Sequence, residues 1–243
     1  MMTIKRIAGA AVAAGAAATL IAGCSSTDDG APVPGTQTTT ASAVDATKAP
    51  TLIIGKADLP AGYQVMDVPK DQIQKVSESI LSSTKSAKVT PSNCMQLSAF
   101  PDKIDVGKTG FIVAMKSTSV LAETVSVVDS SIDDYRKAVT GDCANLNIEI
   151  TEGQAAGAKG VVVSKIVDAP KTSADEAIVV QQNSTITFQG TKTKTSMIIG
   201  YAMVNGYLVS VQASEAAPGA TPDLAAFNKV FAKSVDKVAQ KTA

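Results

Sequence analysis

Residues 195–214 read TSMIIGYAMV-NG-YLVSVQAS, and this stretch decides the fold. Asn205-Gly206 stands between two runs rich in aliphatic and aromatic residues. This dipeptide favours the two-residue turn in which both central residues have positive φ. A two-residue turn also fixes the pairing register of the strands that it joins. We therefore predict a β-hairpin in which Val204 pairs with Tyr207.

This register assigns the hairpin side chains to two faces. One face carries only apolar residues and glycine, in four pairs: Val204 with Tyr207, Ala202 with Val209, Gly200 with Val211 and Ile198 with Ala213. After the hairpin, Phe227 and Phe231 recur at helical spacing on one apolar stripe. We expect these large rings to fill the space above the small Gly200, so this face should be core.

The opposite face of the hairpin allows two interpretations. It carries a set of large, mostly apolar side chains that we name the candidate groove: Met197, Ile199, Tyr201, Met203 and Leu208. Their neighbours on the second strand are the polar Ser210, Gln212 and Ser214. An apolar strand beside a polar one either packs under a helix, here the one predicted after Pro69, or lines a partly hydrated groove. Both alternatives remain open.

The rest of the chain alternates strand-like and helix-like patterns. Strands are predicted at 110–116, 120–128, 147–151, 160–167 and 177–188, and helices after Pro69, Thr90-Pro91, Asp129 and Thr221-Pro222. The pattern predicts an α+β fold with a largely antiparallel twisted sheet packed by helices. In this fold the C-terminal β-hairpin is followed by a closing helix.

The N-terminus has the pattern of a secretory signal. Lys5 and Arg6 precede an uncharged run of small and aliphatic residues that ends in IAGC at 21–24. These four residues resemble the lipobox of bacterial lipoproteins, and the resemblance implies cleavage before Cys24 and acylation of that cysteine. The alternative is a plain secretory signal with an incidental cysteine.

We therefore expect three segments. They are a lipoprotein signal peptide at 1–23, an acylated Cys24 with a disordered Ser/Thr/Ala/Pro tether over 24–50, and a single α+β domain over 51–243. The tether has almost no large apolar residue, so it cannot bury enough surface to offset its chain entropy. The expected location is the extracytoplasmic face of the cell membrane, where the lipid anchor alone holds the protein.

Two cysteines remain for the folded part, Cys94 and Cys143. An exported protein lies in an oxidising compartment, so we expect a disulfide between them rather than two free buried thiols. On the chain-entropy model a bridge across a loop of this size stabilises the fold by roughly 4 kcal/mol. The cysteines lack C-x-x-C spacing, which indicates a structural bond rather than a redox site.

Composition excludes several classes of function. The chain of 243 residues has no His and no Trp, and 22 Lys and Arg balance 22 Asp and Glu. Without His the chain lacks the usual general base near neutral pH and the commonest metal ligand. A near-neutral chain also lacks the basic footprint that nucleic acid requires. We expect no catalytic residue, no metal, no cofactor and no nucleic-acid partner.

Three polar motifs are interpreted as surface features. Gly107-Lys108-Thr109 lacks the earlier glycine of a phosphate-binding loop, because position 102 is Asp. The acidic pair Asp133-Asp134 is expected on an exposed helix face. The segment Lys192-Thr193-Lys194 is expected at the solvated tip of a hairpin, where lysines protect a sheet edge.

The order of several short motifs is similar to that of a known family. Residues 59–238 resemble the extracellular sensor domain of the mycobacterial kinase PknH and actinobacterial lipoproteins built on that domain. The motifs are Leu59-Pro60-Ala61-Gly62-Tyr63, Pro91-Ser92-Asn93-Cys94, the later Cys143, Asn205-Gly206-Tyr207 and the terminal helix. Mog1/PsbP-like lipoproteins are a related possibility. The resemblance implies a sandwich-like α+β domain with a cleft for an unidentified envelope ligand, and usually two disulfides where this chain can form one.

Together these features predict a membrane-anchored envelope lipoprotein whose non-catalytic domain binds an unknown ligand or protein partner. One alternative is a structural or assembly accessory of an envelope complex, without a small ligand. A hydrolase that works without histidine is a third.

Overall fold

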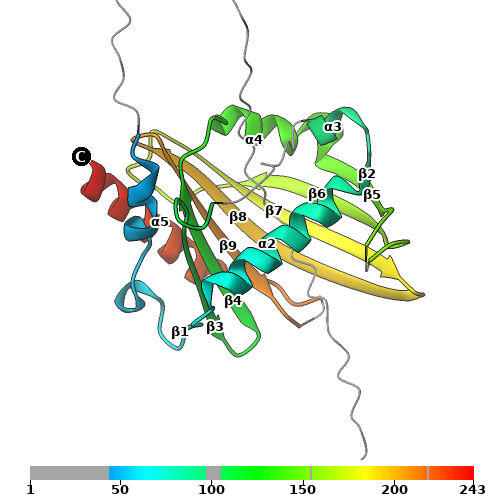
Figure 1. The fold of residues 1–243 in the computed structure, drawn as a ribbon, viewed down its shortest axis with the longest axis horizontal. Coiled ribbons are helices and arrows are strands. Elements are labelled where there is room, and N and C mark those ends of the chain that lie inside the picture. The colour runs from blue at the N-terminus through cyan, green and yellow to red at the C-terminus, as the bar shows by residue number, and fades with distance from the viewer. Residues whose placement is uncertain (1–43, 97–104, 154, 218) are drawn as a thin grey trace, which may run out of the picture.

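A computed structural model describes residues 44–96, 105–153, 155–217 and 219–243. Its centre is a nine-stranded sheet in the order β1-β3-β4-β9-β8-β7-β6-β5-β2, and all of its strand pairs are antiparallel. The sheet is strongly twisted, and helices lie on both of its sides (Figure 1). The predicted α+β class, with a largely antiparallel sheet and a closing C-terminal helix, is confirmed.

The strands follow the predicted segments closely. They are β1 Gln64–Val65, β2 Ala87–Thr90, β3 Gly110–Lys116, β4 Ser119–Ser126, β5 Asn145–Ile150, β6 Lys159–Val167, β7 Glu176–Phe188, β8 Thr191–Val204 and β9 Tyr207–Glu215. The helices are η1 Ala46–Lys48, α1 Ala49–Leu52, η2 Lys56–Asp58, α2 Lys70–Lys85, α3 Asn93–Gln96, α4 Ile132–Ala138, η3 Gly141–Ala144 and α5 Leu224–Thr242. The sequence did not predict β2, a short strand that pairs only at the edge of the sheet.

The C-terminal hairpin has the predicted register at every position. Val204 pairs with Tyr207 and Gly200 with Val211, and the turn residues Asn205 and Gly206 have φ of 48° and 81°. A second positive-φ pair, Gln189-Gly190, joins β7 to β8. Strand β8 therefore begins before Lys192 and Lys194, which lie within the strand and not in the turn that the sequence predicted.

Helix α5 packs on the predicted inner face of the hairpin. A Cβ atom added to Gly200 would lie 2.6 Å from Phe231 Cε2 and 3.0 Å from Phe227 Cζ. Both rings are fully buried, and they stack with their centroids 5.6 Å apart. Gly200 is thus required by the close approach of the helix to the sheet, as the sequence predicted.

The start of α5 differs from the prediction. Asp223, not Thr221, caps the helix, and its carboxylate accepts a hydrogen bond from the Ala226 N–H at 2.9 Å. Leu224, which was placed on the apolar stripe, is 49% exposed because it lies in the first turn beyond the edge of the core. The remaining stripe, which includes Val235 and Val238, is buried.

The described part of the chain includes residues 44–50, which the sequence assigned to the tether. Ala49 begins α1 and is fully buried against β3, where a side chain at Gly110 would clash with the Ala49 backbone and with Ile53. The Tyr207 hydroxyl donates to the Asp45 carbonyl at 2.8 Å. This segment has too few large apolar residues to be recognised by composition, but its small side chains allow it to pack closely.

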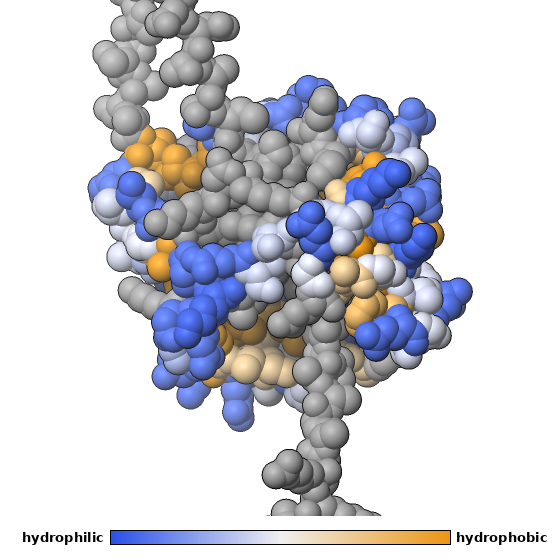
Figure 2. All heavy atoms as spheres, turned by 45° about the vertical axis from the view of Figure 1, so that its right-hand side comes forward, coloured by the Kyte–Doolittle hydropathy of each residue, from blue (hydrophilic) through white to orange (hydrophobic). Residues whose placement is uncertain are grey.

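Helix α2 is present over nearly the predicted range and crosses in front of the sheet in Figure 1. Its predicted apolar face included Val76, Ile80 and Leu81, whose side chains lie outside the described part of the structure. On the face of the molecule drawn in Figure 2, apolar surface is divided into separate patches among polar residues.

Candidate functional site

The candidate groove residues lie in a packed core. Met197, Ile199, Tyr201 and Leu208 are 3%, 2%, 7% and 0% exposed, and Met203 is half-buried against the same cluster. They pack with Ile132, Ile178 and Val180 and with side chains of α4. Of the two interpretations that the sequence left open for this face, the burial of these side chains agrees with a covered core and not with an open groove.

Helix α4 covers Tyr201, where the sequence pointed to the helix after Pro69. The Tyr135 ring of α4 stacks on the Tyr201 ring with centroids 4.4 Å apart. Burial raises the pKa of the Tyr135 hydroxyl far above its ordinary value. The helix is capped by Ser131 in a capping box with Asp134, and not by Asp129 as predicted.

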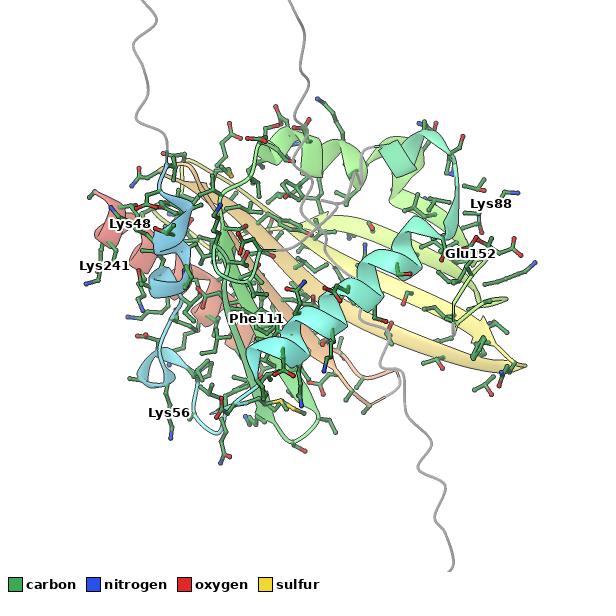
Figure 3. The ribbon with its side chains drawn as sticks, in the orientation of Figure 1. Lys48, Lys56, Lys88, Phe111, Glu152 and Lys241 are labelled. Atoms are coloured by element: carbon green, nitrogen blue, oxygen red, sulfur yellow. A yellow bond between two sulfur atoms is a disulfide. The ribbon has the colours of Figure 1, made fainter. Side chains whose placement is uncertain are left out.

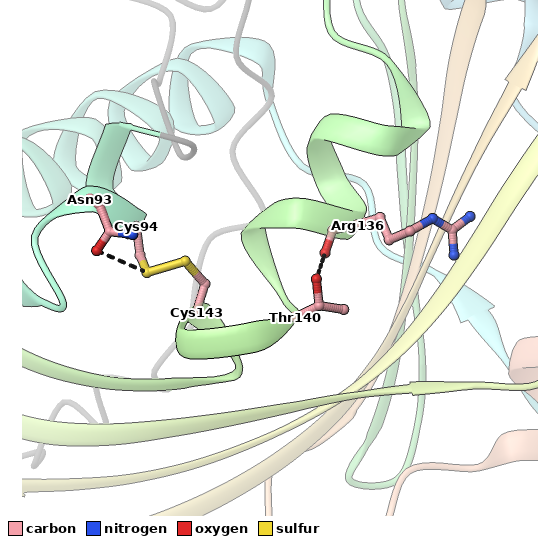
Figure 4. Close-up of a disulfide and its surroundings, with 5 residues drawn as sticks. All are labelled: Asn93, Cys94, Arg136, Thr140 and Cys143. Carbon is pink, nitrogen blue, oxygen red and sulfur yellow. Dashed lines mark hydrogen bonds between the residues drawn. A yellow bond between two sulfur atoms is a disulfide. The ribbon is translucent and has the colours of Figure 1, made fainter.

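The predicted disulfide is formed. Cys94 in α3 and Cys143 in η3 have Cα atoms 5.5 Å apart and a sequence separation of 49 (Figure 4). The bond ties the end of β2 to the turn that follows α4, just before β5. It therefore helps to hold α4 over the hairpin. Cys24, the predicted acylation site, lies outside the described residues.

The described residues cover the other side of the sheet only in part. Helix α5 packs over β9 and the C-terminal half of β8, while side chains of β2, β5, β6, β7 and the N-terminal half of β8 face outward beyond it. We call this surface the open face. Its residues follow from the strand register: Lys88, Thr90, Asn145, Asn147, Glu149, Lys159, Val161, Val163, Lys165, Asn183, Thr185, Thr187, Lys192 and Lys194.

Two apolar side chains at the middle of the open face are exposed to solvent. Val161 and Val163 on β6 are 44% and 41% exposed, although β6 is an inner strand of the sheet. The solvated face of an antiparallel sheet usually carries polar residues, so two neighbouring exposed valines on it are unusual. Their exposure marks the open face as a surface suited to contact with another molecule.

A shallow hollow of about 430 Å³ lies on the open face. Most of its lining residues have polar side chains, and they come from five strands: Lys88, Thr90, Asn147, Ile148, Glu149, Lys159, Gly160, Val161, Thr185, Thr187 and Lys192. Lys88 stands at the end of the molecule opposite to Lys48 and Lys241 (Figure 3). Glu149 forms an ion pair with Lys159, with an N–O distance of 3.1 Å.

A buried carboxyl group lies elsewhere, beneath α5. Glu123 on β4 is 1% exposed, and its Oε2 accepts a hydrogen bond from the Ile54 N–H at 2.9 Å. Burial raises the pKa of this carboxyl to about 7, although the Ile54 N–H, the Ser234 hydroxyl and the Lys237 ammonium each favour its charged form. Lys237 donates instead to the Ile53 carbonyl. Glu123 thus connects Ile54, just after α1, to strand β4 of the sheet.

The remaining polar motifs are surface features. Asp133 and Asp134 lie in the first turn of α4 and pair with Arg136 and Lys137 of the same helix. Lys108 pairs with Asp105 in a turn before β3. Within the described ranges there is no group of three or more Cys, Asp or Glu side chains arranged to hold a metal, and no helix long and apolar enough to cross a bilayer.

The sequence contained a local signal for the open face. From Lys159 to Lys165 every second residue is Lys or exposed Val, while Val162 and Ser164 between them are buried. This period of two shows that β6 has two unlike faces. It does not show which other strands add to the exposed side, so the sequence did not predict the hollow.

Comparison with known proteins finds similarity only among solved structures. No protein-family model and no curated protein sequence matches the chain. An X-ray structure of an uncharacterised Mycobacterium smegmatis protein, the Rv0999 ortholog, is 13% identical, with a TM-score of 0.47 over 80% of this chain and 97% of that one. The extracellular domain of PknH from Mycobacterium tuberculosis is also 13% identical, with a TM-score of 0.44 over 81% and 97%. At this level of similarity the comparisons assign no activity, and the function has to be inferred from the site.

Proposed function

We propose that this protein is an acylated lipoprotein of the cell envelope that presents a non-catalytic binding domain, and that the open face is its binding surface. The observation that carries the proposal is the exposure of Val161 and Val163 on β6, an inner strand of the nine-stranded sheet, beside a hollow lined from five strands. Contact with a ligand or partner would remove these side chains from water.

Two further features support an exported binding protein. The disulfide between Cys94 and Cys143 is of the kind that persists in oxidising compartments. The polar groups on the open face are mainly Lys, Thr and Asn side chains, which serve as hydrogen-bond donors and acceptors.

The binding surface can be tested in cells by thiol protection. A Val163→Cys variant and a control, Lys137→Cys on the exposed side of α4, are labelled with a membrane-impermeant maleimide. We expect the thiol at 163 to react fully in the purified protein and several-fold more slowly than the control in intact cells. Equal labelling of both positions in cells would show that nothing occupies the open face.

The anchor is tested separately through Cys24. A Cys24→Ala variant is expected to leave the exported domain soluble or the precursor uncleaved. High-salt washing of membranes distinguishes lipid anchoring from electrostatic adsorption. A mature Cys24→Ala protein that stays in the washed membrane would contradict the lipoprotein assignment.

A further inference from the structure

We infer that the ligand of the open face is an extended anionic polysaccharide, whose carboxylate or phosphate groups lie over lysines on the sheet. This inference rests on the proposed function, because it names the chemistry of the molecule that would cover Val161 and Val163. It depends on the distribution of charge, on the spacing of the lysines and on the neutral groups between them.

Charge on the open face is strongly asymmetric for a chain whose net charge is zero. Five lysines face outward from these strands: Lys88, Lys159, Lys165, Lys192 and Lys194. Among the described residues of the open face, Glu149 is the one acid, and it is already paired with Lys159. Two nearby acids are Glu152, in the loop after β5, and Glu215 on β9, whose carboxylate binds the Thr118 and Ser119 hydroxyls. The surface therefore attracts anions.

The lysines repeat along a row that crosses the strands. In the register, Lys192 on β8, Lys159 on β6 and Lys88 on β2 occupy the same row, with Thr187 and Glu149 on the strands between them. Neighbouring strands are about 4.8 Å apart, so these lysines emerge at intervals of about 10 Å. A compact anion needs donors that converge on one point. Charges spread at a regular interval instead match a polymer that carries repeated anionic groups.

Neutral hydrogen-bonding groups fill the next row. Thr90, Asn147 and Thr185 lie on either side of Val161, and Lys194 ends the row on β8. Hydroxyl and amide side chains both donate and accept hydrogen bonds, as sugar hydroxyls require. The exposed valines can contact the apolar C–H surfaces of sugar rings. This combination distinguishes a polysaccharide from a simple inorganic anion.

Other anionic macromolecules fit this surface less well. Single-stranded nucleic acid is held by aromatic side chains that stack on its bases, and the described residues of the open face include none. A planar bilayer does not follow a hollowed surface. An extended acidic peptide would pair with the backbone of an edge strand such as β2, because a sheet face offers no backbone partners.

The test measures binding of polygalacturonate to the detergent-solubilised full chain by calorimetry, with neutral dextran for comparison. A triple variant, Lys88→Gln, Lys159→Gln and Lys192→Gln, removes the lysine row. The matched control changes Lys75, Lys108 and Lys137 to Gln, which alters the net charge equally outside the open face. We expect the row variant to bind about tenfold more weakly or worse, because three charge contacts of modest strength are lost. The control should bind like the wild type, and binding should weaken as salt is added.

Each other outcome overturns the inference. An anionic polysaccharide on the open face is contradicted if polygalacturonate does not bind or if neutral dextran binds equally well. It is also contradicted if the two triple variants lose the same amount of affinity. Equal or tighter binding of polyglutamate or of anionic lipid vesicles through the same lysines would identify a different class of ligand. If polygalacturonate fails while Val163→Cys remains protected in cells, the ligand chemistry is wrong but the binding surface stands.

Discussion

Replacement of Glu123 by Gln tests how a buried carboxyl group sets the pH dependence of stability. Glu123 lies between the sheet and α5, and it accepts the Ile54 N–H at 2.9 Å. Among the described residues, its other oxygen Oε1 and the Ser234 hydroxyl make no hydrogen bond of normal geometry. Glutamine has nearly the same shape, can still accept from Ile54, and carries no charge. The variant therefore removes the ionisation and little else.

The size of the expected change in unfolding free energy follows from the pKa of Glu123. Burial raises the pKa of Glu123 from 4.5 to about 7, and each unit of pKa is worth about 1.36 kcal/mol, so the full effect is roughly 3 kcal/mol. The folded protein holds this proton more tightly than the unfolded chain. The contribution of protonated Glu123 is therefore fully present below pH 4.5 and decreases as the pH rises toward 7. Above pH 7 the folded protein contains a buried carboxylate and this contribution is gone.

Urea unfolding at pH 5, 6, 7 and 8 measures the effect. Between pH 5 and pH 8 we expect the wild type to lose roughly 2–3 kcal/mol more unfolding free energy than Glu123→Gln, because all other groups titrate equally in both proteins. Glu149→Gln, the same substitution at a half-exposed strand position, is the matched control. If the unfolding free energy of Glu123→Gln falls with pH as steeply as that of the wild type, the pKa of Glu123 is not raised in the folded protein.

Three further changes test the core and the disulfide. Gly200→Val should lower the unfolding free energy by about 1–3 kcal/mol or more, because its Cβ would lie 2.6 Å from a Phe231 ring atom, and a urea melt equal to that of the wild type would refute the packing. Tyr201→Ala should cost about 3 kcal/mol or more, since the ring is buried, and a loss below about 1 kcal/mol would instead indicate a solvent-lined site. Reducing the bond between Cys94 and Cys143 should lower the thermal midpoint, with a cost of about 2–4 kcal/mol. The corresponding double Ser variant should melt at the same temperature with and without reductant, and free thiols in the unreduced, unfolded wild type would contradict the bond.

The sequence alone predicted the structure correctly where a few neighbouring residues decide the backbone geometry. The hairpin register follows from Asn205-Gly206 alone, because a two-residue turn leaves one pairing and thereby sets the face of each side chain. Helix starts depend on more than the local sequence. Thr221 and Asp223 both have capping side chains, and only the position of the first helical turn on the sheet selects Asp223.

Long-range packing decided the features that bear on function. The apolar pattern around Tyr201 allowed either a core or a groove, and the choice depended on α4, which arrives from a distant segment fastened by Cys143. Glu123 shares its face of β4 with the buried Leu121 and Val125, and only the packing of α5 and of the chain around Ile54 over this face encloses its carboxyl group.

The sequence by itself determined the fold class, the strand order within the hairpin and the pairing of the two cysteines in the folded part. The fold class follows from the periodicity of apolar residues, and the hairpin follows from its turn residues. The disulfide follows from the presence of only two cysteines in the folded part. The open face was decided by tertiary structure alone. Its lysines and threonines come from β2, β5, β6, β7 and β8, and only the complete sheet brings them side by side. Whether such a face is covered depends on the length and path of a helix packed elsewhere, which no local pattern encodes.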